Sequence, residues 1–229
     1  MAVTEVFVTA QAQARHGELV EAAGRAGATV YSVSGEVMAD LAQTVTPQGL
    51  LAICRFVDVP LDRVAALRDG RPTLVVVLAH VRDPGNAGTV LRTADAAGAQ
   101  AVIFSDASVD PYNGKCVRAS AGSLFHVPIV VGSRLADTVR VLRGAGLRIL
   151  AADGSAQRSL DEPGMSGLLG EPTAWLFGNE ARGLPRELIG LADEAVRVPI
   201  YGRAESLNLA TAAAVCLYTS ARALMSVPR

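Results

Sequence analysis

The feature that most constrains the fold is the run from Leu74 to Leu78, which is aliphatic at every position. A strand with no polar face must be covered on both sides, as the strands of parallel sheets are. Similar short apolar runs recur along the chain and alternate with segments of helical periodicity. This alternation predicts an α/β domain with a mostly parallel sheet. The further strands are expected at residues 101–104, 127–131, 147–152, 173–177 and 196–199.

The residues before Leu74 predict a smaller αβ unit. The segment 58–70 is polar and is closed by Gly70-Arg71-Pro72, which is typical of a break between domains. We therefore expect two domains, residues 1–70 and residues 71–229. In the first domain, strands are expected near residues 4–9, 29–33 and 50–56, and helices at residues 16–26 and 35–41.

The composition excludes some classes of protein. Hydrophobic residues make up 50% of the 229 residues, which is enough for a large core and too many for a disordered chain. The net charge is −1 and the pI is about 6.3, so there is no general signal for nucleic acid. Residues 1–70 hold five arginines and eight acids, whereas residues 71–229 hold sixteen basic and fourteen acidic residues. This asymmetry permits a polyanion site in the second domain.

Cysteine usage and the N-terminus bear on the compartment. Cys54, Cys116 and Cys216 are scattered and match no metal-binding spacing, so we expect reduced thiols and no bound metal. The N-terminus lacks a signal-peptide pattern, and no apolar run reaches the roughly 20 residues of a membrane span. We therefore expect a cytoplasmic protein with no membrane association.

Three loops that follow expected strands carry polar side chains beside glycine. Glycine lets a backbone approach a ligand closely, and loops after neighbouring parallel strands meet at one edge of a sheet. One interpretation is a ligand site at that edge; the other is that the polar residues are helix caps or first-turn acids. The residues are Asn86, Gly88 and Arg92 after the first strand, Gly178, Glu180 and Gly183 after the second, and Gly202, Ser206 and Asn208 after the third.

Two further observations narrow the chemistry. Arg92 stands among apolar residues, so an idle surface role is less natural for it. The third loop leads into an alanine-rich helix, for which Ser206 and Asn208 are both suitable N-caps. The sequence has no P-loop, no Gly-x-Gly-x-x-Gly and no serine–histidine–acid set, so common NTPase and hydrolase mechanisms receive little support. His80 and His126 lack matching partners and are expected to be structural.

These motifs together resemble one family. Residues 83–98 (DPGNAGTVLRTADAAG), 176–185 (LFGNEARGLP) and 198–210 (VPIYGRAESLNLA) are similar, in this order, to the three motifs of the SpoU (TrmH-like) branch of the SPOUT methyltransferases. Residues 117–125 (VRASAGSLF) are also similar, and the resemblance covers roughly residues 72–225. The first domain resembles the later part of the family's L30e-like substrate-binding domain. It begins after the usual basic segment, helix and strand, so we expect a shortened domain with a weaker grip on RNA.

The resemblance implies a fold and an activity. The expected activity is 2′-O-ribose methylation of RNA with S-adenosyl-L-methionine, on rRNA rather than tRNA. The implied fold is an α/β SPOUT domain with a trefoil knot, and the implied assembly is a homodimer with active sites at its interface. Family motifs place the cofactor pocket at Phe177, Gly178, Asn179, Val198, Ile200 and Leu207, and the polar active-site groups at Asn86, Arg92, Glu180, Ser206 and Asn208. The candidate contacts to RNA are Arg82, Lys115, Arg118 and Arg203.

Two alternatives remain beside this interpretation. A non-catalytic SPOUT-fold RNA-binding or ribosome-assembly factor would be favoured by loss of Arg92, Glu180 or Asn208, and all three are present. A SPOUT enzyme that methylates a base is disfavoured by the Ser206-Leu207-Asn208 match.

The residues themselves agree with the implied cofactor and substrate. An adenosine-type cofactor is well held by peptide groups and an apolar wall, and Arg92 is the obvious cation for an RNA phosphate.

Overall fold

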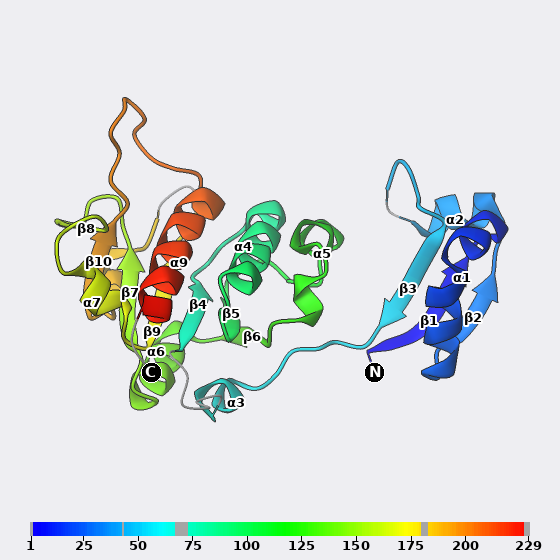
Figure 1. Cartoon of the computed structure of the whole chain (residues 1–229), viewed down its shortest axis with the longest axis horizontal. Helices are drawn as coiled ribbons and strands as arrows, with labels where there is room; N and C mark the ends of the chain where they lie inside the picture. Colours follow the sequence, from blue (N-terminus) through cyan, green and yellow to red (C-terminus); the bar gives the residue numbers. More distant parts are fainter. Residues whose placement is uncertain (1, 43, 67–72, 180–182, 227–229) are drawn as a thin grey trace. The chain divides into compact units, whose positions relative to one another are not determined.

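The computed structural model describes residues 2–42, 44–66, 73–179 and 183–226 (Figure 1). The chain divides into two compact units, Met1–Val57 and Asp58–Arg229, each of which is described by itself. The expected boundary at Gly70 to Pro72 lies outside the described residues. Residues 58–66 group with the second unit, since Val64 of helix α3 (Leu61–Ala66) belongs to its hydrophobic core.

The first unit is a three-stranded sheet with two helices. Its strand order is β2-β1-β3, with β1 parallel to β2 and antiparallel to β3. One core cluster is formed by Val8, Ala12 and Val20 with the half-buried Leu50, and Val6, Ala28 and Met38 are also buried. The elements are β1 (Val3–Val8), α1 (Ala10–Arg25), β2 (Thr29–Ser32), α2 (Gly35–Leu41) and β3 (Leu50–Cys54).

Helix α1 begins earlier than the sequence analysis predicted. The expected start at His16 is wrong, because Thr9 caps the helix and its side chain accepts a hydrogen bond from the Ala12 amide. His16 lies inside α1 at a kink, with φ −126° and ψ 31°. The sequence pattern therefore predicted only the second half of this helix.

The second unit contains a seven-stranded sheet in which every paired neighbour is parallel. This confirms the predicted α/β class. All residues of β4, β5 and β9 are buried, as the continuous apolar runs required. In spatial order the strands are β6 (Ile129–Ser133), β5 (Ala101–Ser105), β4 (Leu74–Leu78), β9 (Thr173–Phe177), β7 (Arg148–Ala152), β10 (Glu194–Arg197) and β8 (Arg158–Ser159).

Helices cover both faces of this sheet (Figure 1). One face presents alternate strand residues such as Val75, Val77 and Ile103 to α3 and α6 (Leu135–Gly144). The other face lies against α4 and α9, and the indole of Trp175 donates a 2.9 Å hydrogen bond to Ser220 of α9. Helix α5 packs against α4. These elements are α4 (Pro84–Ala96), α5 (Gly114–Ser120) and α9 (Leu209–Ser226); shorter ones are η1 (Ser123–Phe125), α7 (Met165–Leu169) and α8 (Arg186–Ile189).

Helix α9 is the one described helix with the length and hydropathy of a membrane span, 18 residues at a mean hydropathy of 1.2. By length and composition alone, this helix therefore differs from the prediction that no apolar run is long enough to span a membrane. The structure gives another reason for the apolar composition, because one side of α9 packs inside the second unit. Its buried residues are Ala210, Ala213, Cys216, Leu217, Ser220 and Leu224.

Several element boundaries differ from the predictions for local reasons. The last strand is Glu194–Arg197 rather than 196–199, and Pro199 lacks the N–H that a ladder needs. The sequence pattern predicts a helix over residues 115–124, but α5 ends at Ser120, where Ala121 adopts a left-handed φ of 48°. Residues 155–170, whose glycines and serines predict an irregular connection, contain β8 and α7. The trefoil knot stays a prediction, since part of the loop after β9, residues 180–182, lies outside the described residues.

Candidate active site

A cavity of about 540 Å³ opens at the carboxyl edge of the sheet, beside β9, β7 and β10. The loop from β10 to α9 closes one side of it. The lining is a mixture of aliphatic side chains, peptide groups and a few polar side chains. It comprises Ala152, Asp153, Gly154, Phe177, Gly178, Asn179, Gly183, Val196, Arg197, Val198, Ile200, Glu205, Ser206, Leu207, Leu209 and Ala212.

The six residues that the resemblance assigned to the cofactor all line this cavity. They come from two segments far apart in the chain, which the sheet brings together. The segment after β9 turns back on itself, with the Asn179 amide donating to the Gly183 carbonyl at 3.1 Å and the Gly183 amide donating to the Asn179 carbonyl at 2.8 Å. The residues concerned are Phe177, Gly178, Asn179, Val198, Ile200 and Leu207.

Gly178 makes this return possible. A Cβ atom at this position would overlap the backbone of Gly183 and Leu184. A backbone neighbour cannot rotate away as a flexible side chain can, so the loop would have to open. Glycine is therefore required by the loop itself rather than, as the sequence suggested, by a ligand that approaches it.

His80 holds the same loop from the neighbouring strand end. Its carbonyl accepts a 3.0 Å hydrogen bond from the Asn179 side-chain amide, and its own amide donates to Ser105 Oγ at 2.9 Å. His80 has a φ of 57°, which is uncommon for a residue other than glycine. Sequence reasoning expected only a structural side chain here and missed this backbone role. No sequence signal could have shown it, because the contact depends on a dihedral angle.

The N-termini of α4 and α9 are joined through two asparagines. Asn208 Nδ2 donates to Asn86 Oδ1 at 3.0 Å. The Asn208 Oδ1 atom accepts from the amides of Ala210 at 2.9 Å and Thr211 at 3.3 Å, so Asn208 is the cap of α9. Ser206, the other expected cap, lines the cavity instead. The structure thus brings the first and third motifs together at a single point.

An acid and a lysine fix the start of α4. Asp83 Oδ1 accepts from the Asn86 amide at 2.7 Å, and Asp83 Oδ2 pairs with Lys115 Nζ at 2.9 Å. These two contacts, the amide first and the ammonium second, lower the pKa of Asp83 below its ordinary value. Lys115, expected to contact RNA, therefore also has a structural partner in Asp83, the N-cap of α4.

The remaining predicted cations are exposed. Arg92 lies on the outer side of α4 and makes no hydrogen bond or ion pair within the described residues. Arg82 precedes α4, Arg118 lies on α5, and Arg203 lies in the loop before α9. Glu180 falls outside the described residues, so its expected role stays a prediction.

The sequence analysis missed the loop after β7. Strand β7 lies between β9 and β10, so Asp153 and Gly154 line the cavity between the two predicted loops. An Asp-Gly pair after an apolar run is a readable turn signal. What the sequence lacked was the strand order that makes this loop a neighbour of the others.

Glu205 is the second lining residue that was missed. Its carboxylate makes no hydrogen bond or ion pair within the described residues, whereas Asp153 accepts from the amide and hydroxyl of Ser155. The guanidinium of Arg197 donates to the carbonyls of Ala156 and Gln157. Among the described lining residues, the charge left for a ligand is therefore negative.

Fold and site together define a class of protein. A three-layer α/β domain holds a cavity lined by aliphatic side chains, peptide groups and a few polar side chains at the carboxyl edge of a parallel sheet, which suits a nucleoside-type cofactor. An exposed arginine and a pair of bonded asparagines lie on the helices that begin at this edge. Arginine is a common ligand of nucleic-acid phosphates, so this edge holds groups suited to a nucleoside-type cofactor and to a phosphate.

Comparison with known proteins identifies the family. Residues 73–218 match the SpoU rRNA Methylase family, and residues 1–60 match the domain described as RNA 2′-O ribose methyltransferase substrate binding. The chain therefore belongs to the SpoU rRNA methylase family, which confirms the resemblance of its motifs.

Individual relatives agree with this assignment. The chain is 35% identical over 195 residues to the 23S rRNA (guanosine(2553)-2′-O)-methyltransferase of Bacillus subtilis (strain 168), covering 84% of this chain and 72% of that protein. It is 34% identical over 223 residues to a 23S rRNA (guanosine-2′-O-)-methyltransferase of Bordetella pertussis, covering 96% and 89%. The crystal structure of the AdoMet-bound rRNA methyltransferase from Sinorhizobium meliloti superposes with a TM-score of 0.80 at 32% identity, covering 98% of this chain and 82% of that one.

Proposed function

We propose that this protein transfers a methyl group from S-adenosyl-L-methionine to a ribose 2′-hydroxyl of 23S rRNA. The observation that carries the proposal is the cavity at the carboxyl edge, where the second and third family motifs meet. The family match and the AdoMet-bound relative from Sinorhizobium meliloti support the choice of cofactor. The two 23S rRNA methyltransferases described above support the choice of RNA.

The cavity fits this cofactor on its own chemistry. Aliphatic groups such as Val198 and Leu207 offer an apolar wall for a neutral adenine ring, and the loop backbones after β9 and β10 offer peptide hydrogen bonds. The Glu205 carboxylate faces a ligand that carries positive charge. When bound, S-adenosyl-L-methionine supplies an electrophilic methyl group on a sulfonium.

The residues beside the cavity would position the ribose. A ribose hydroxyl is a poor nucleophile, so the site must favour its oxygen as the proton leaves. Arg92 is effectively always protonated, and we assign it to grip a neighbouring phosphate in bidentate fashion and place positive charge near that oxygen. The hydrogen bond between Asn86 and Asn208 joins the starts of α4 and α9, and Ser206 lines the cavity. Positioning and electrostatics thus provide most of the catalysis.

We further propose that the protein acts as a cytoplasmic homodimer. Helix α9 has apolar residues on its outer side as well as its buried side, which is more than a helix at a protein surface requires. Val215, Tyr218 and Met225 are exposed by 39%, 50% and 81%. Sedimentation at micromolar concentration should show a dimer, and substitution of Tyr218 by Glu should shift it towards monomer. A wild-type monomer would contradict this part of the proposal.

Methyl transfer itself tests the activity. The purified protein is incubated with S-adenosyl-L-methionine carrying a labelled methyl group and with unmodified 23S rRNA or tRNA made by transcription. We expect one 2′-O-methylated nucleotide in the rRNA, located by its resistance to alkaline cleavage, and none in the tRNA. Label on a base would favour the base-methylating alternative. Tight binding of the rRNA without transfer would favour the assembly factor.

A further inference from the structure

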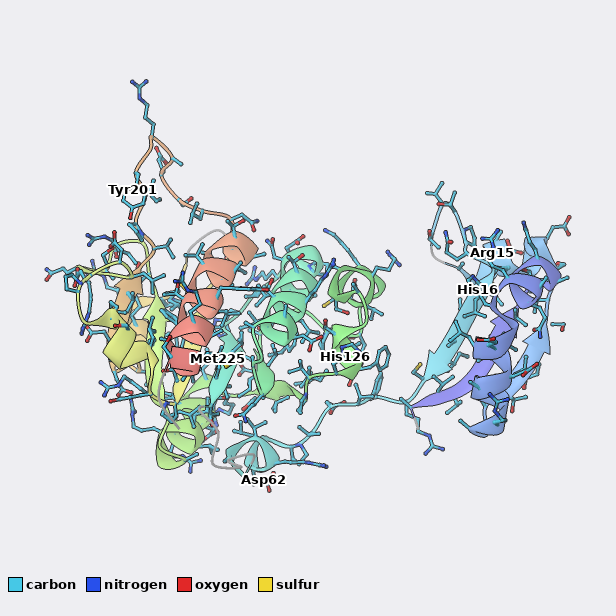
Figure 2. The ribbon with its side chains drawn as sticks, viewed as in Figure 1. Arg15, His16, Asp62, His126, Tyr201 and Met225 are labelled. Atoms are coloured by element: carbon cyan, nitrogen blue, oxygen red, sulfur yellow. The ribbon has the colours of Figure 1, made fainter. Side chains whose placement is uncertain are left out.

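An exposed aromatic side chain stands beside the cavity. Tyr201 lies in the loop between β10 and α9, next to Ile200, which lines the cavity. The Tyr201 side chain is 85% exposed and is not itself part of the cavity lining. Figure 2 shows it on the loop that extends beyond the carboxyl end of β10. The ring is therefore outside the cofactor cavity, on a residue adjacent in sequence to one that lines it.

The ring is held in place at its hydroxyl. Tyr201 Oη donates to Asp161 Oδ2 at 2.6 Å, and Ser159 Oγ donates to Asp161 Oδ1 at 2.6 Å. Hydrogen bonds to a carboxylate at this distance are of the strong, charge-assisted kind. Ser159 belongs to β8 and is paired with Arg197 of β10, so the anchor belongs to the sheet. The exposed Tyr201 side chain is thus connected, through Asp161 and Ser159, to the edge strand of the sheet.

The protonation states suit this anchor. The hydrogen bonds from Ser159 and then Tyr201 lower the pKa of Asp161, and the bond to Asp161 raises the pKa of Tyr201. At neutral pH the carboxylate is therefore ionised and the phenol keeps its proton. These protonation states are the ones that the hydrogen bond from Tyr201 to Asp161 requires.

A fixed ring with free faces is suited to stacking. Tyrosine combines a large apolar body with a polar edge, and here the edge is bound while the body remains in water. Proteins that bind single-stranded RNA stack unpaired bases on such aromatic faces. Arg203, two residues further along the loop, is exposed and has no hydrogen bond or ion pair within the described residues. Arg203 could bind a phosphate of the RNA while the Tyr201 ring stacks on the neighbouring base.

We propose that Tyr201 stacks on an unpaired base of the RNA substrate and so positions the neighbouring ribose at the mouth of the cavity. This rests on the proposed methyltransferase function and deepens it, because it names a single-stranded, unstacked segment as the substrate. Tyr201 is a positioning residue, and Asp161 and Ser159 preorganise it. A ring whose faces are in water adds little to the stability of the folded chain.

Three substitutions at one position separate the ring from its anchor. Tyr201→Leu removes both, Tyr201→Phe keeps the ring and removes the anchor, and Tyr201→Trp keeps a larger stacking surface. Binding to unmodified 23S rRNA made by transcription is measured by filter retention, and cofactor binding is measured by calorimetry. We expect Tyr201→Leu to weaken RNA binding roughly 10-fold, the scale of one lost base stack. Tyr201→Phe should lose only a few-fold, Tyr201→Trp should restore binding, and cofactor affinity should stay unchanged in all three.

A spectroscopic signal gives a readout that a purely structural role would not move. The indole introduced by Tyr201→Trp should be quenched when the rRNA is added, because a stacked base quenches it. The native Trp175 is 0% exposed and supplies the unquenched reference. Unchanged RNA affinity in Tyr201→Leu, or an indole that the RNA does not quench, would overturn the inference. So would conversion of Tyr201→Leu to a monomer with RNA affinity intact, which would place the ring against a second copy.

The two proposals fail in distinguishable ways. If the wild-type protein binds the rRNA but transfers no methyl group, the proposed function fails, while the binding and quenching data still judge Tyr201. If methyl transfer occurs and none of the three substitutions changes RNA binding, only the assignment of Tyr201 fails.

Discussion

The two units of this chain both contain parallel strands, yet they differ in how those strands are covered. In the second unit every residue of β4, β5 and β9 is buried, whereas in the first unit no residue of β2 is. In the first sheet Phe7 is stacked on Tyr31 with ring centroids 5.1 Å apart, and Tyr31 is 43% exposed. Layers on both faces hold the loops of the second sheet in fixed positions, which a site for chemistry needs.

The hollows at the ends of the strands show the same difference. The first unit has a cavity of about 590 Å³ lined mainly by polar groups of the first turns of α1 and α2 and by the loop 47–49, with Arg15 its one cation among the described lining residues. The cavity of the second unit is similar in volume, about 540 Å³, but its lining adds apolar side chains from three strand ends and from the loop before α9 to the polar groups. The two cavities are therefore similar in volume but differ in the groups that line them. We attribute cofactor binding to the second unit alone.

The strongest way to sharpen this comparison is Gly178→Val. The new side chain would overlap the backbone of Gly183 and Leu184, so the loop must open and the cavity wall is lost. Binding of S-adenosyl-L-methionine in calorimetry should become undetectable, at least 100-fold weaker than the micromolar affinity expected of the wild type. The matched control is Gly167→Val in α7, where a Cβ meets nothing within 4 Å. Normal cofactor binding by Gly178→Val would show that this loop is not part of the site.

Arg92→Lys separates the reaction from cofactor binding within the second unit. Lysine keeps the charge but lacks the planar fork of the guanidinium. Single-turnover methylation should slow by roughly 100-fold, the scale of losing one preorganised donor. Cofactor affinity should barely change, because Arg92 is not among the residues that line the cavity. A rate near that of the wild type, or an equal loss of cofactor, would show that the assignment is wrong.

Met38→Ala tests whether the two units are independent. Met38 of α2 is 2% exposed, so truncation leaves a cavity in the small first unit and should lower its free energy of unfolding by about 2 kcal/mol. Thermal unfolding followed by circular dichroism should then show an earlier first transition. Cofactor binding should remain as in the wild type. Loss of cofactor binding in this variant would break the division of roles between the units.

The smallest effect is expected at the start of α4. Asp83→Ala removes a cap and should cost about 1 kcal/mol of unfolding free energy, whereas Asp83→Asn keeps an acceptor for the Asn86 amide. The pKa of Asp83 is lower in the folded state, so its stabilisation is present above its unfolded pKa of about 3.9 and is lost as the pH falls through the folded value. Denaturant titrations between pH 3 and pH 7 should therefore show that the free energy of unfolding falls less steeply with decreasing pH in Asp83→Asn than in the wild type. An equal fall in the two proteins would contradict this prediction.

The sequence by itself determined the parts of the site that depend on local patterns. Continuous apolar runs such as Leu74–Leu78 indicated strands buried on both faces, and turn formers after them marked two of the loops that line the cavity. The sequence narrowed the cap of α9 to Ser206 or Asn208, because capping depends on the residue type near the first turn, and the structure selected Asn208. Each of these signals lies within a few residues along the chain.

Only the tertiary structure decided which loops meet. Strand β7 lies between β9 and β10, which makes Asp153 and Gly154 part of the cavity, and no local pattern encodes that order. His80 acts through its carbonyl and a left-handed backbone, and Tyr201 through a partner forty residues away. The physical reason is that strand order and backbone dihedral angles at strand ends follow from how buried surfaces fit over the whole unit. Residue types along a short segment do not contain that information.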